Sequence, residues 1–449
     1  MTSNHSPQHD HLGVQHMKTR DPGTKRQLDI VIVGGSLGGL CTALALKSHP
    51  QRHRITILER NATPLLHDQG AGIVAGGDTL AFFKRYDRCG RQFAVSSQRR
   101  QYLNKEGEII YAKDMVQNMT SWDLIYHMLR ANVDGVESAY CDVPEQRAED
   151  GEVKHLHGHK VTGIREEGSR VQVSYQTVNG QEGTFEADLV IGADGPSSTV
   201  RSVFEPTLQR TYAGYVALRG TVREDEVTQA AREAFSERFT FFHATGIQIL
   251  AYLIPGEKGA LEPGQRLINF VYYTNFPCNS LDNPSPELAN LLTDIDGVRH
   301  RITVPPGKTD PSAWEKERAT ARNKLPPQFA EIVRATKKPF VQAITDVISH
   351  ENEFLGGKVI LIGDALAGFR PHTVASTSQA AYDAMILADM IEGRIEKEKW
   401  KRQTMEYARM VQKRGVGMGN RSQFEDLPVG EMIRDRNVAS QPRAEGGCM

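Results

Sequence analysis

Cysteine is scarce in this chain, and the cysteines present follow no metal-binding or disulfide pattern. The 449 residues include five of them, Cys41, Cys89, Cys141, Cys278 and Cys448, with no C-x-x-C pair. Their odd number and scattered positions favour a reducing compartment and argue against a zinc site or a disulfide framework. We therefore expect a cytoplasmic protein without a metal centre.

Long apolar runs and a strong charge of one sign are also missing. No stretch of about 18 apolar residues occurs, so we expect no segment that spans a membrane. The net charge of −1 gives no electrostatic reason to expect nucleic acid or an anionic membrane as a partner. The polar residues 1–27 lack the apolar core of a secretory signal, and we interpret them as a disordered tail.

The composition is otherwise that of a large soluble protein. Hydrophobic residues make up 39% of the chain and charged residues 24%. At this length we expect roughly two or three domains, with enough apolar sequence to bury a sizeable core.

A glycine-rich turn follows the first apolar run, where residues 29–40 read DIVIVGGSLGGL. Gly34 and Gly39 take the first and sixth positions of G-x-G-x-x-G, and Ser36 replaces the middle glycine. In this motif the outer glycines allow the tight turn and close packing of helix on strand, and the middle position faces a pyrophosphate. Glu59 ends the next apolar strand, where a carboxylate accepts hydrogen bonds from ribose hydroxyls and favours FAD or NAD over NADP.

Two further segments combine an apolar strand with a turn, ADLVIGADG at 187–195 and KVILIGDALAG at 358–368. Asp364 comes at a strand end, where it can accept hydrogen bonds from a polyol such as the ribityl chain of a flavin. Pro371 then precedes a Thr/Ser-rich helix start, whose N–H groups and dipole favour an anion. We also predict a helix over 120–132 from the capping box Thr120-x-x-Asp123.

The middle of the chain, residues 204–344, differs in character. It contains aromatic and β-branched segments such as TYAGYVALRGTV and RLINFVYYTNFP, separated by turn residues. This pattern predicts an antiparallel sheet inserted between the nucleotide-type segments.

Taken in order, these segments resemble a known family. GGSLGGL, the strand ending in Glu59, ADLVIGADGPSSTVR and VILIGDALAGFRPHT are similar to the FAD fingerprint, Asp-Gly and Gly-Asp motifs of single-component (group A) flavoprotein aromatic hydroxylases. The chain looks most like the dihydroxypyridine hydroxylase branch, where serine in the fingerprint is familiar and RPHT replaces a His-Pro-containing loop. YAGYVALRG and PFVQAITD add to the resemblance, which covers about residues 28–392.

The resemblance implies an α/β fold and a division of the chain. A Rossmann-like FAD-binding domain, like that of para-hydroxybenzoate hydroxylase, would comprise 28–203 and 345–393. An inserted antiparallel-sheet substrate domain would comprise 204–344, and a C-terminal helix and mobile tail 394–449.

The resemblance also implies which positions hold noncovalent FAD. The positions for the ADP half are Gly34, Ser36, Gly39 and Glu59. Those for the pyrophosphate region are Asp194, Gly195 and Arg201, and those for the flavin end are Asp364, Pro371 and Ser376. Asp364 would hold the ribityl chain, and Pro371 would face the isoalloxazine ring. Ser376 and Val374 depart from the family, which has glycines there, and their side chains are expected to shift the ring or slow its movement.

The implied activity is monooxygenation of an electron-rich aromatic or heteroaromatic ring, such as a phenol or hydroxypyridine. NAD(P)H would reduce FAD, O2 would add to give a flavin hydroperoxide, and its distal oxygen would pass to the ring. NAD(P)H would bind only transiently, because no second G-x-G-x-x-G is present; GVGMGN at Gly415 lacks the sixth glycine and a preceding strand.

Four side chains are candidates for handling the substrate. A ring hydroxyl reacts faster when deprotonated, so we nominate His372, His243 and Tyr272 for proton transfer and Arg219 as an anion or orientation contact. His372 leads because its loop would lie beside the flavin. For each residue a purely structural role in the sheet stays open.

Alternative functions also stay open. The same FAD fold serves epoxidation, Baeyer–Villiger insertion or oxidative rearrangement of a natural-product-like substrate, because pocket shape decides the oxygen acceptor. A non-catalytic binding protein on this fold is a further alternative. A homodimer is compatible with the sequence, which gives no direct sign of one.

Overall fold

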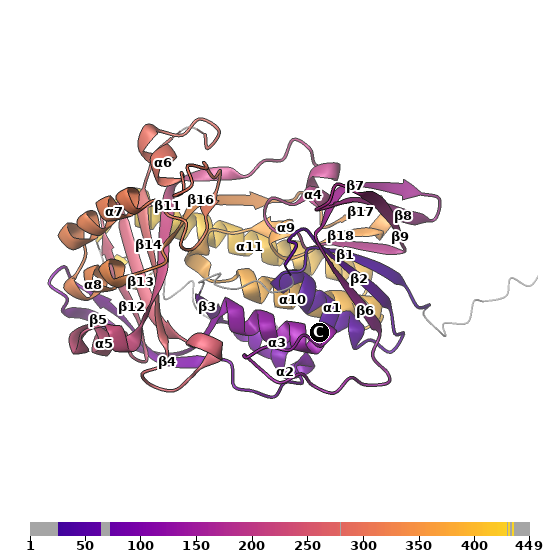
Figure 1. The fold of residues 1–449 in the computed structure, drawn as a ribbon, viewed down its shortest axis with the longest axis horizontal. Coiled ribbons are helices and arrows are strands. Elements are labelled where there is room, and N and C mark those ends of the chain that lie inside the picture. Colours follow the sequence, from indigo (N-terminus) through magenta and orange to yellow (C-terminus); the bar gives the residue numbers. More distant parts are fainter. Residues whose placement is uncertain (1–25, 64–71, 279, 429, 432, 435–449) are drawn as a thin grey trace, which may run out of the picture.

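The computed structural model describes residues 26–434 except 64–71, 279, 429 and 432. Two units lie side by side: a six-stranded sheet with its helices, and a larger sheet whose far face carries a second group of helices (Figure 1). This arrangement confirms the predicted α/β fold with an added antiparallel sheet. The tail predicted for 1–27 lies outside the described residues except for its last two. None of the helices described is both long and apolar enough to cross a membrane.

Parallel strands form the six-stranded sheet, in the order β17-β18-β10-β1-β2-β6; only β17 runs antiparallel to its neighbour. Strands such as β1 are apolar after their first residue, because both faces of a parallel sheet are covered. The strands are β1 Asp29–Val33, β2 Arg54–Glu59, β6 Glu152–His157, β10 Leu189–Gly192, β17 Glu353–Phe354 and β18 Val359–Leu361.

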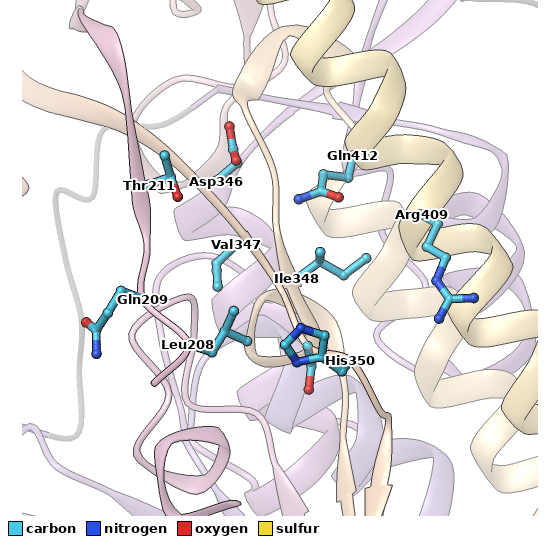
Figure 2. A pocket seen from close by; sticks show the side chains of 10 residues that line it. Leu208, Gln209, Thr211, Asp346, Val347, Ile348, His350, Arg409 and Gln412 are labelled. Carbon is cyan, nitrogen blue, oxygen red and sulfur yellow. The ribbon is translucent and has the colours of Figure 1, made fainter. Parts of the chain in front are cut away.

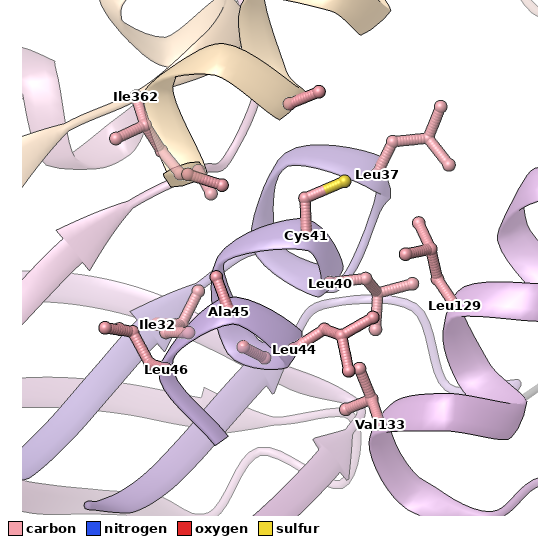
Figure 3. Packing of buried hydrophobic residues seen from close by; sticks show 14 of the residues in the cluster. Ile32, Leu37, Leu40, Cys41, Leu44, Ala45, Leu46, Leu129, Val133 and Ile362 are labelled. Carbon is pink, nitrogen blue, oxygen red and sulfur yellow. The ribbon is translucent and has the colours of Figure 1, made fainter. Parts of the chain in front are cut away.

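Helices cover one face of this sheet, and a mixed layer covers the other. The first face packs against α1 Leu37–Lys47, α2 Gly77–Tyr86, α3 Trp122–Asp134 and α10 Ser376–Ile391. Figure 3 shows Leu40 and Leu44 of α1 beside Leu129 and Val133 of α3. The second face packs against β7 His159–Glu167, β8 Arg170–Thr177, β9 Glu182–Ala187, α4 Thr199–Phe204, α9 Gly363–Leu366 and α11 Lys397–Phe424.

The helix predicted from the capping box exists, but its cap is a different residue. Helix α3 begins at Trp122, and the Ser121 hydroxyl accepts from Leu124 N at 3.2 Å. Thr120 still belongs to β5, where it pairs with Ile73, and its hydroxyl donates to the Phe93 carbonyl. The capping-box prediction was wrong by one residue, because the Thr120 hydroxyl is turned to the Phe93 carbonyl and the Ser121 hydroxyl caps the helix instead.

The larger sheet is mainly antiparallel, as predicted, in the order β15-β16-β11-β14-β13-β12-β4-β5-β3, with β19 paired to β16. Its strands are β3 Gly72–Ala75, β4 Val95–Leu103, β5 Ile109–Ser121, β11 Thr211–Arg223, β12 Arg238–Ala244, β13 Ile247–Ile254, β14 Leu267–Asn275, β15 Thr303–Val304, β16 Phe340–Ile348 and β19 Ala367–Gly368. Strands β3 to β5 come from the stretch that we assigned to the FAD-binding domain. They join this sheet because β4 pairs in parallel with β12, whose edge would otherwise expose unpaired backbone groups.

Side chains alternate between the two faces of the larger sheet. Its back face packs against α5 Gln229–Phe235, α6 Pro286–Leu291, α7 Pro311–Lys324 and α8 Pro327–Ala335, seen at the left of Figure 1. Its front face, which contains Tyr215 and Tyr273, packs against Val374 after the short helix η4 Pro371–Thr373. Three other short helices connect the larger elements: η1 Glu224–Glu226, η2 Glu257–Gly259 and η3 Leu355–Gly357.

The GVGMGN segment lies inside helix α11, where its glycines serve packing. A Cβ atom on Gly415 would lie 3.5 Å from the Arg370 carbonyl oxygen, and one on Gly419 would lie 3.2 Å from His372 Cδ2 and would collide with Tyr215 Oη. These two glycines therefore let α11 lie directly against the η4 loop and the front face.

Candidate functional site

The first and last fingerprint glycines are required by contact between the β1–α1 turn and its surroundings. Gly34 has φ +105°, and a Cβ atom there would lie 2.5 Å from the carbonyl oxygen of Ala193. A Cβ atom on Gly39 would collide with the Gly34 carbonyl oxygen. Larger residues at either position would displace the turn, so glycine is needed at both, as the fingerprint motif predicts.

Ser36 occupies a position that does not need glycine. Its φ of −92° is open to any residue, and it precedes the first residue of α1 as the N-cap. Its hydroxyl makes no capping hydrogen bond, so the side chain is not used to satisfy the N-terminus of its own helix. The first turn of α1 thus keeps backbone N–H groups suited to a phosphate.

Glu59 connects the strand β2 to the fingerprint turn. Its Oε2 accepts from Gly35 N at 2.9 Å and its Oε1 from Asn61 N at 2.8 Å, and the residue is buried. Each carboxylate oxygen retains one further acceptor direction, so Glu59 can fix the turn and still accept from a ligand hydroxyl.

Two histidines that we did not predict lie beside Glu59. His157 pairs with Glu59 across β2 and β6, and the His155 and His157 rings stack at 4.2 Å. His155 contacts Gly35 so closely that a Cβ atom there would collide with its ring. Burial lowers the pKa of His157 to about 4, so its ring is neutral at physiological pH.

An ion pair supports this histidine pair from helix α3. Asp134 lies 3.4 Å from His155 Nδ1 and 2.9 Å from Arg130. Burial raises the pKa of Asp134, but hydrogen bonds from His155 and Arg130 outweigh burial and lower it overall. The HLH alternation after Glu152 was a weak sequence signal for these side chains, because nothing local tied them to Glu59.

Asp194 holds the first turn of α4. Its Oδ2 accepts from Thr199 N at 2.6 Å and Val200 N at 3.2 Å, and Gly195 follows with φ +78°. Burial raises the pKa of Asp194 although these hydrogen bonds oppose it. Arg201 braces the segment, donating to Ala365 O at 2.6 Å and Pro196 O at 2.5 Å.

Asp364 follows the end of β18 and is the counterpart of Asp194. Burial raises its pKa to about 6, against the charge of Arg210 and a hydrogen bond from the Ser376 side chain. Arg210 is partly buried, and the loss of solvent lowers its pKa to about 10. Ser376 thus touches the carboxyl group proposed to hold the ribityl chain, a contact that a glycine there could not make.

The turn before Asp364 is held by a second buried acid that sequence analysis missed. Gly363, with φ +54°, donates its N–H to Asp383 Oδ2 at 2.9 Å, and Gln379 donates to the Gly363 carbonyl at 3.1 Å. Both partners come from helix α10. The only sequence signal was an aspartate within an alanine-rich helix, AAYDA.

The η4 loop lies against the front face of the larger sheet. His372 is buried, its Nε2 lies 2.9 Å from Tyr215 Oη, and its ring stacks on Tyr273 at 4.3 Å. Pro371 begins η4 and Val374 ends it with φ +52°, a left-handed conformation that is strained for a β-branched residue.

The other nominated substrate residues are spread over the larger sheet. His243 and Gln248 lie on the front face in the same cross-strand row as Tyr273, and Gln248 Nε2 lies 3.3 Å from His243 Nε2. Arg219 belongs to the same face, with its Cζ 5.1 Å from the centre of the Phe340 ring. Tyr272 points to the back face and packs with the residues under α5 to α8, so the structure does not bring it to His372.

A pocket of about 280 Å³ lies where the start of β11, the end of β16 and helix α11 meet (Figure 2). It is lined by Leu208, Gln209, Thr211, residues 346–350, Arg409 and Gln412. None of the predicted site residues lines it. Its link to the site is Asp346, whose Oδ2 accepts from Arg370 Nε at 2.6 Å.

Orphaned acceptors test whether FAD suits these residues. Asp194 Oδ1 and Asp364 Oδ1 are buried with no hydrogen-bond partner in the described part of the chain, and both follow strands of the six-stranded sheet at its carboxyl edge. Together with the glycine cradle before α1, they offer acceptors to a polyol and donors to a phosphate. The residues present fit a dinucleotide with a sugar-alcohol chain.

Comparisons with known proteins agree with this geometry. Residues 27–262 match the FAD binding domain family, and residues 212–346 match a FAD binding domain-like family. The chain is 28% identical to 2,6-dihydroxypyridine 3-monooxygenase of Paenarthrobacter nicotinovorans, covering 80% of this chain and 82% of that protein. It is 25% identical to salicylate hydroxylase of Pseudomonas putida, covering 82% and 77%.

Solved structures show the same fold. The structure of 2,6-dihydroxypyridine-3-hydroxylase from Arthrobacter nicotinovorans has a TM-score of 0.75 at 26% identity, covering 89% of this chain and 94% of that one. Klebsiella pneumoniae HpxO, complexed with FAD and uric acid, has a TM-score of 0.62 at 18% identity, covering 92% and 93%.

Proposed function

The chain belongs to the FAD binding domain family of single-component flavoprotein monooxygenases, and we propose that it hydroxylates an electron-rich aromatic or heteroaromatic small molecule with NAD(P)H and O2. A phenol or hydroxypyridine is the proposed substrate class. The observation that carries the proposal is the pair of orphaned carboxylate oxygens, on Asp194 and Asp364, at the carboxyl edge of a sheet with a glycine cradle.

The proposed FAD contacts follow from that edge. The α1 turn with Gly34, Ser36 and Gly39 would receive the pyrophosphate, and Glu59 the ribose of the ADP half. Asp364 would accept from the ribityl chain while Ser376 supports it. When bound, FAD would supply the redox and oxygen-activating chemistry, and the chain would bind it, orient it and exclude water.

The proposed substrate site lies between the η4 loop and the front face of the larger sheet. Residues 204–344 together with β3 to β5 form the substrate domain in this proposal. Tyr273 and His372 stack on each other there, which places an imidazole where the loop meets the sheet. His372 is the group proposed to contact the ring hydroxyl, with Arg219 as a second, cationic contact.

The proposal is tested by an absorbance spectrum of the purified protein after incubation with FAD, followed by NADH and NADPH oxidation with a panel of hydroxypyridines and phenols. We expect flavin bands released by acid, substrate-stimulated oxidation, and a product heavier by one oxygen atom. Asp364→Ala should lose FAD, whereas Asp282→Ala, which removes a surface carboxylate paired with Arg301, should not. A protein that takes up no FAD would overturn the proposal.

A further inference from the structure

We propose that Tyr215 fixes His372 as the neutral tautomer with its ring proton on Nδ1, so that His372 is a hydrogen-bond donor and not the base that removes the substrate proton. The tautomer follows from contacts in this chain alone. What the donor acts on rests on the proposed function.

The two side chains form a closed pair in the interior. Tyr215 is 0% exposed and His372 1%, and Tyr215 Oη lies 2.9 Å from His372 Nε2. Tyr273 covers one side of the imidazole, and Gly419 of α11 lies against Tyr215 Oη and the imidazole edge. This packing holds the ring orientation, so Nε2 is the nitrogen that meets Tyr215.

The position of Arg370 determines whether Tyr215 or His372 donates the hydrogen bond between them. A guanidinium has donors and no acceptor. The Arg370 Cζ lies 5.9 Å from the centre of the Tyr215 ring; burial raises the pKa of Tyr215, and the charge and hydrogen bond of Arg370 oppose this. Because the Arg370 cation lies beside the Tyr215 ring, the lone pairs of Tyr215 Oη turn toward it and the hydroxyl proton is directed to His372 Nε2.

A nitrogen that accepts a hydrogen bond carries no proton. With Nε2 bare, a neutral imidazole has its one proton on Nδ1. Protonating Nε2 as well would set an N–H against the Tyr215 hydroxyl proton and add a second positive charge beside Arg370.

The charged and titratable groups around the pair also favour a neutral ring. They are Tyr215 from β11, Tyr273 from β14, Arg370 from the η4 loop, and Asp346 from β16, which pairs with Arg370 at 2.6 Å. Helix α11 contributes the uncharged Asn420, which accepts from Arg370 at 2.8 Å. The fixed cation Arg370 is already present, and a second buried positive charge on the imidazole would be costly.

The chemical consequence is that His372 donates a hydrogen bond and does not remove the substrate proton. Nδ1 already carries a proton and cannot take another, and the basic Nε2 faces Tyr215. An N–H donor instead stabilises the oxyanion left when a ring hydroxyl loses its proton to water, so the substrate binds more readily in its reactive anionic form. In this role Tyr215 is a positioning residue that acts through His372.

The test is NMR of the protein with ¹⁵N-labelled histidine, because ring ¹⁵N shifts distinguish a protonated nitrogen from a bare one. His372→Gln identifies the His372 signals by their disappearance. We expect a protonated Nδ1 and a bare Nε2 that stay unchanged between about pH 6 and pH 9. Tyr215→Phe should redistribute the proton between the two nitrogens, and Tyr272→Phe, on the back face, should leave the signals unchanged.

Two outcomes would overturn the inference: a proton on Nε2, or protons on both nitrogens at neutral pH. The wild-type spectrum alone yields either, so a Tyr215 variant that fails to fold leaves the test intact. If the tautomer is as expected but no hydroxypyridine or phenol binds, the proposed function fails and the tautomer assignment stands. If a substrate binds, its absorbance should show the anion at lower pH in wild type than in Tyr215→Phe.

Discussion

Gly363 donates its backbone N–H to Asp383 Oδ2 over 2.9 Å, so helix α10 holds the turn that ends β18. Asp383 is fully buried, and burial raises its pKa to about 8 although hydrogen bonds from Gly363 and Gln379 lower it. The carboxyl is therefore mostly protonated at neutral pH, and it positions the neighbouring Asp364.

Asp383→Asn should flatten the pH dependence of stability. The folded pKa of about 8 lies above the unfolded value of about 4, so the native state binds more protons between these values and loses stability as pH rises through them. Asparagine keeps an acceptor for Gly363 and carries no charge. We expect wild type to lose on the order of 1 kcal/mol or more relative to Asp383→Asn between about pH 5 and pH 8.

Thermal unfolding at several pH values measures this difference. Asp282→Asn is the control, since its carboxylate is at the surface and pairs with Arg301. Parallel curves for wild type and Asp383→Asn would show that Asp383 does not titrate as proposed.

Neighbouring glycines of the fingerprint should respond oppositely to alanine. A Cβ atom on Gly39 would collide with the Gly34 carbonyl, whereas one on Gly38 would lie 3.9 Å from Ala193 Cβ and Ala380 Cβ, an ordinary contact. Gly39→Ala should destabilise the protein without FAD by roughly 2 kcal/mol or more through backbone displacement. Gly38→Ala, inside helix α1, should be neutral or stabilise by up to about 1 kcal/mol. Denaturant unfolding decides, and an equal loss in both variants would contradict the contact argument.

At Val374 a glycine variant should be more stable than an alanine variant, the reverse of the usual order. Its φ of +52° is left-handed, a region that costs any L-residue with a Cβ atom roughly 1–2 kcal/mol. Comparing Val374→Gly with Val374→Ala isolates this cost, because both variants lose the valine contacts with the sheet. We expect Val374→Gly to be the more stable by about 1 kcal/mol in denaturant unfolding. Greater stability of the alanine variant would mean that the loop relaxes into another conformation.

FAD affinity should rise as pH rises through about 6. The pKa of Asp364 is about 6, and the ionised carboxylate is the stronger acceptor for ribityl hydroxyls. Ser376→Ala removes the hydrogen bond that lowers this pKa and should move the affinity transition to higher pH. Asp364→Asn should abolish the transition. Flavin fluorescence titrations against pH measure both, and a pH-independent wild type would remove Asp364 from FAD binding.

Substitutions of two adjacent tyrosines should show which face of the larger sheet contributes to catalysis. Tyr273 stacks on His372, whereas Tyr272 packs on the back face. We expect Tyr273→Leu to lower kcat/KM by about tenfold or more through displacement of His372, and Tyr272→Phe to leave it within about twofold. Loss of turnover in Tyr272→Phe with normal stability would restore Tyr272 as a substrate residue.

The strand-and-turn segments could be predicted from sequence because their signals are local. Gly34, Glu59, Asp194 and Asp364 each follow an apolar run, and parallel strands bring such ends to one edge. Strands β4 and β5 could not be predicted in this sheet, since VSSQRRQYL is mostly polar and its pairing with β12 joins distant stretches.

Register explains why the site was only partly predicted. Tyr272 and Tyr273 are equivalent in composition, and only strand pairing decides which one meets His372; a shift of one residue exchanges the faces. Asp383 and His155 were missed for a related reason. Each supports a motif that lies far away in the sequence, so no spacing rule connects them.

The contact of α11 with the η4 loop bears on how the protein is made. Gly415 and Gly419 are synthesised after Arg370 and His372, yet both lie directly against this part of the loop. During translation the nucleotide-type sheet can assemble from its own strands, while the loop has no partner on that side until α11 leaves the ribosome. We infer that the imidazole reaches its final setting only once α11 has packed, and because α11 also covers the second face of the six-stranded sheet, the cofactor fold and the substrate site are completed by the same late helix.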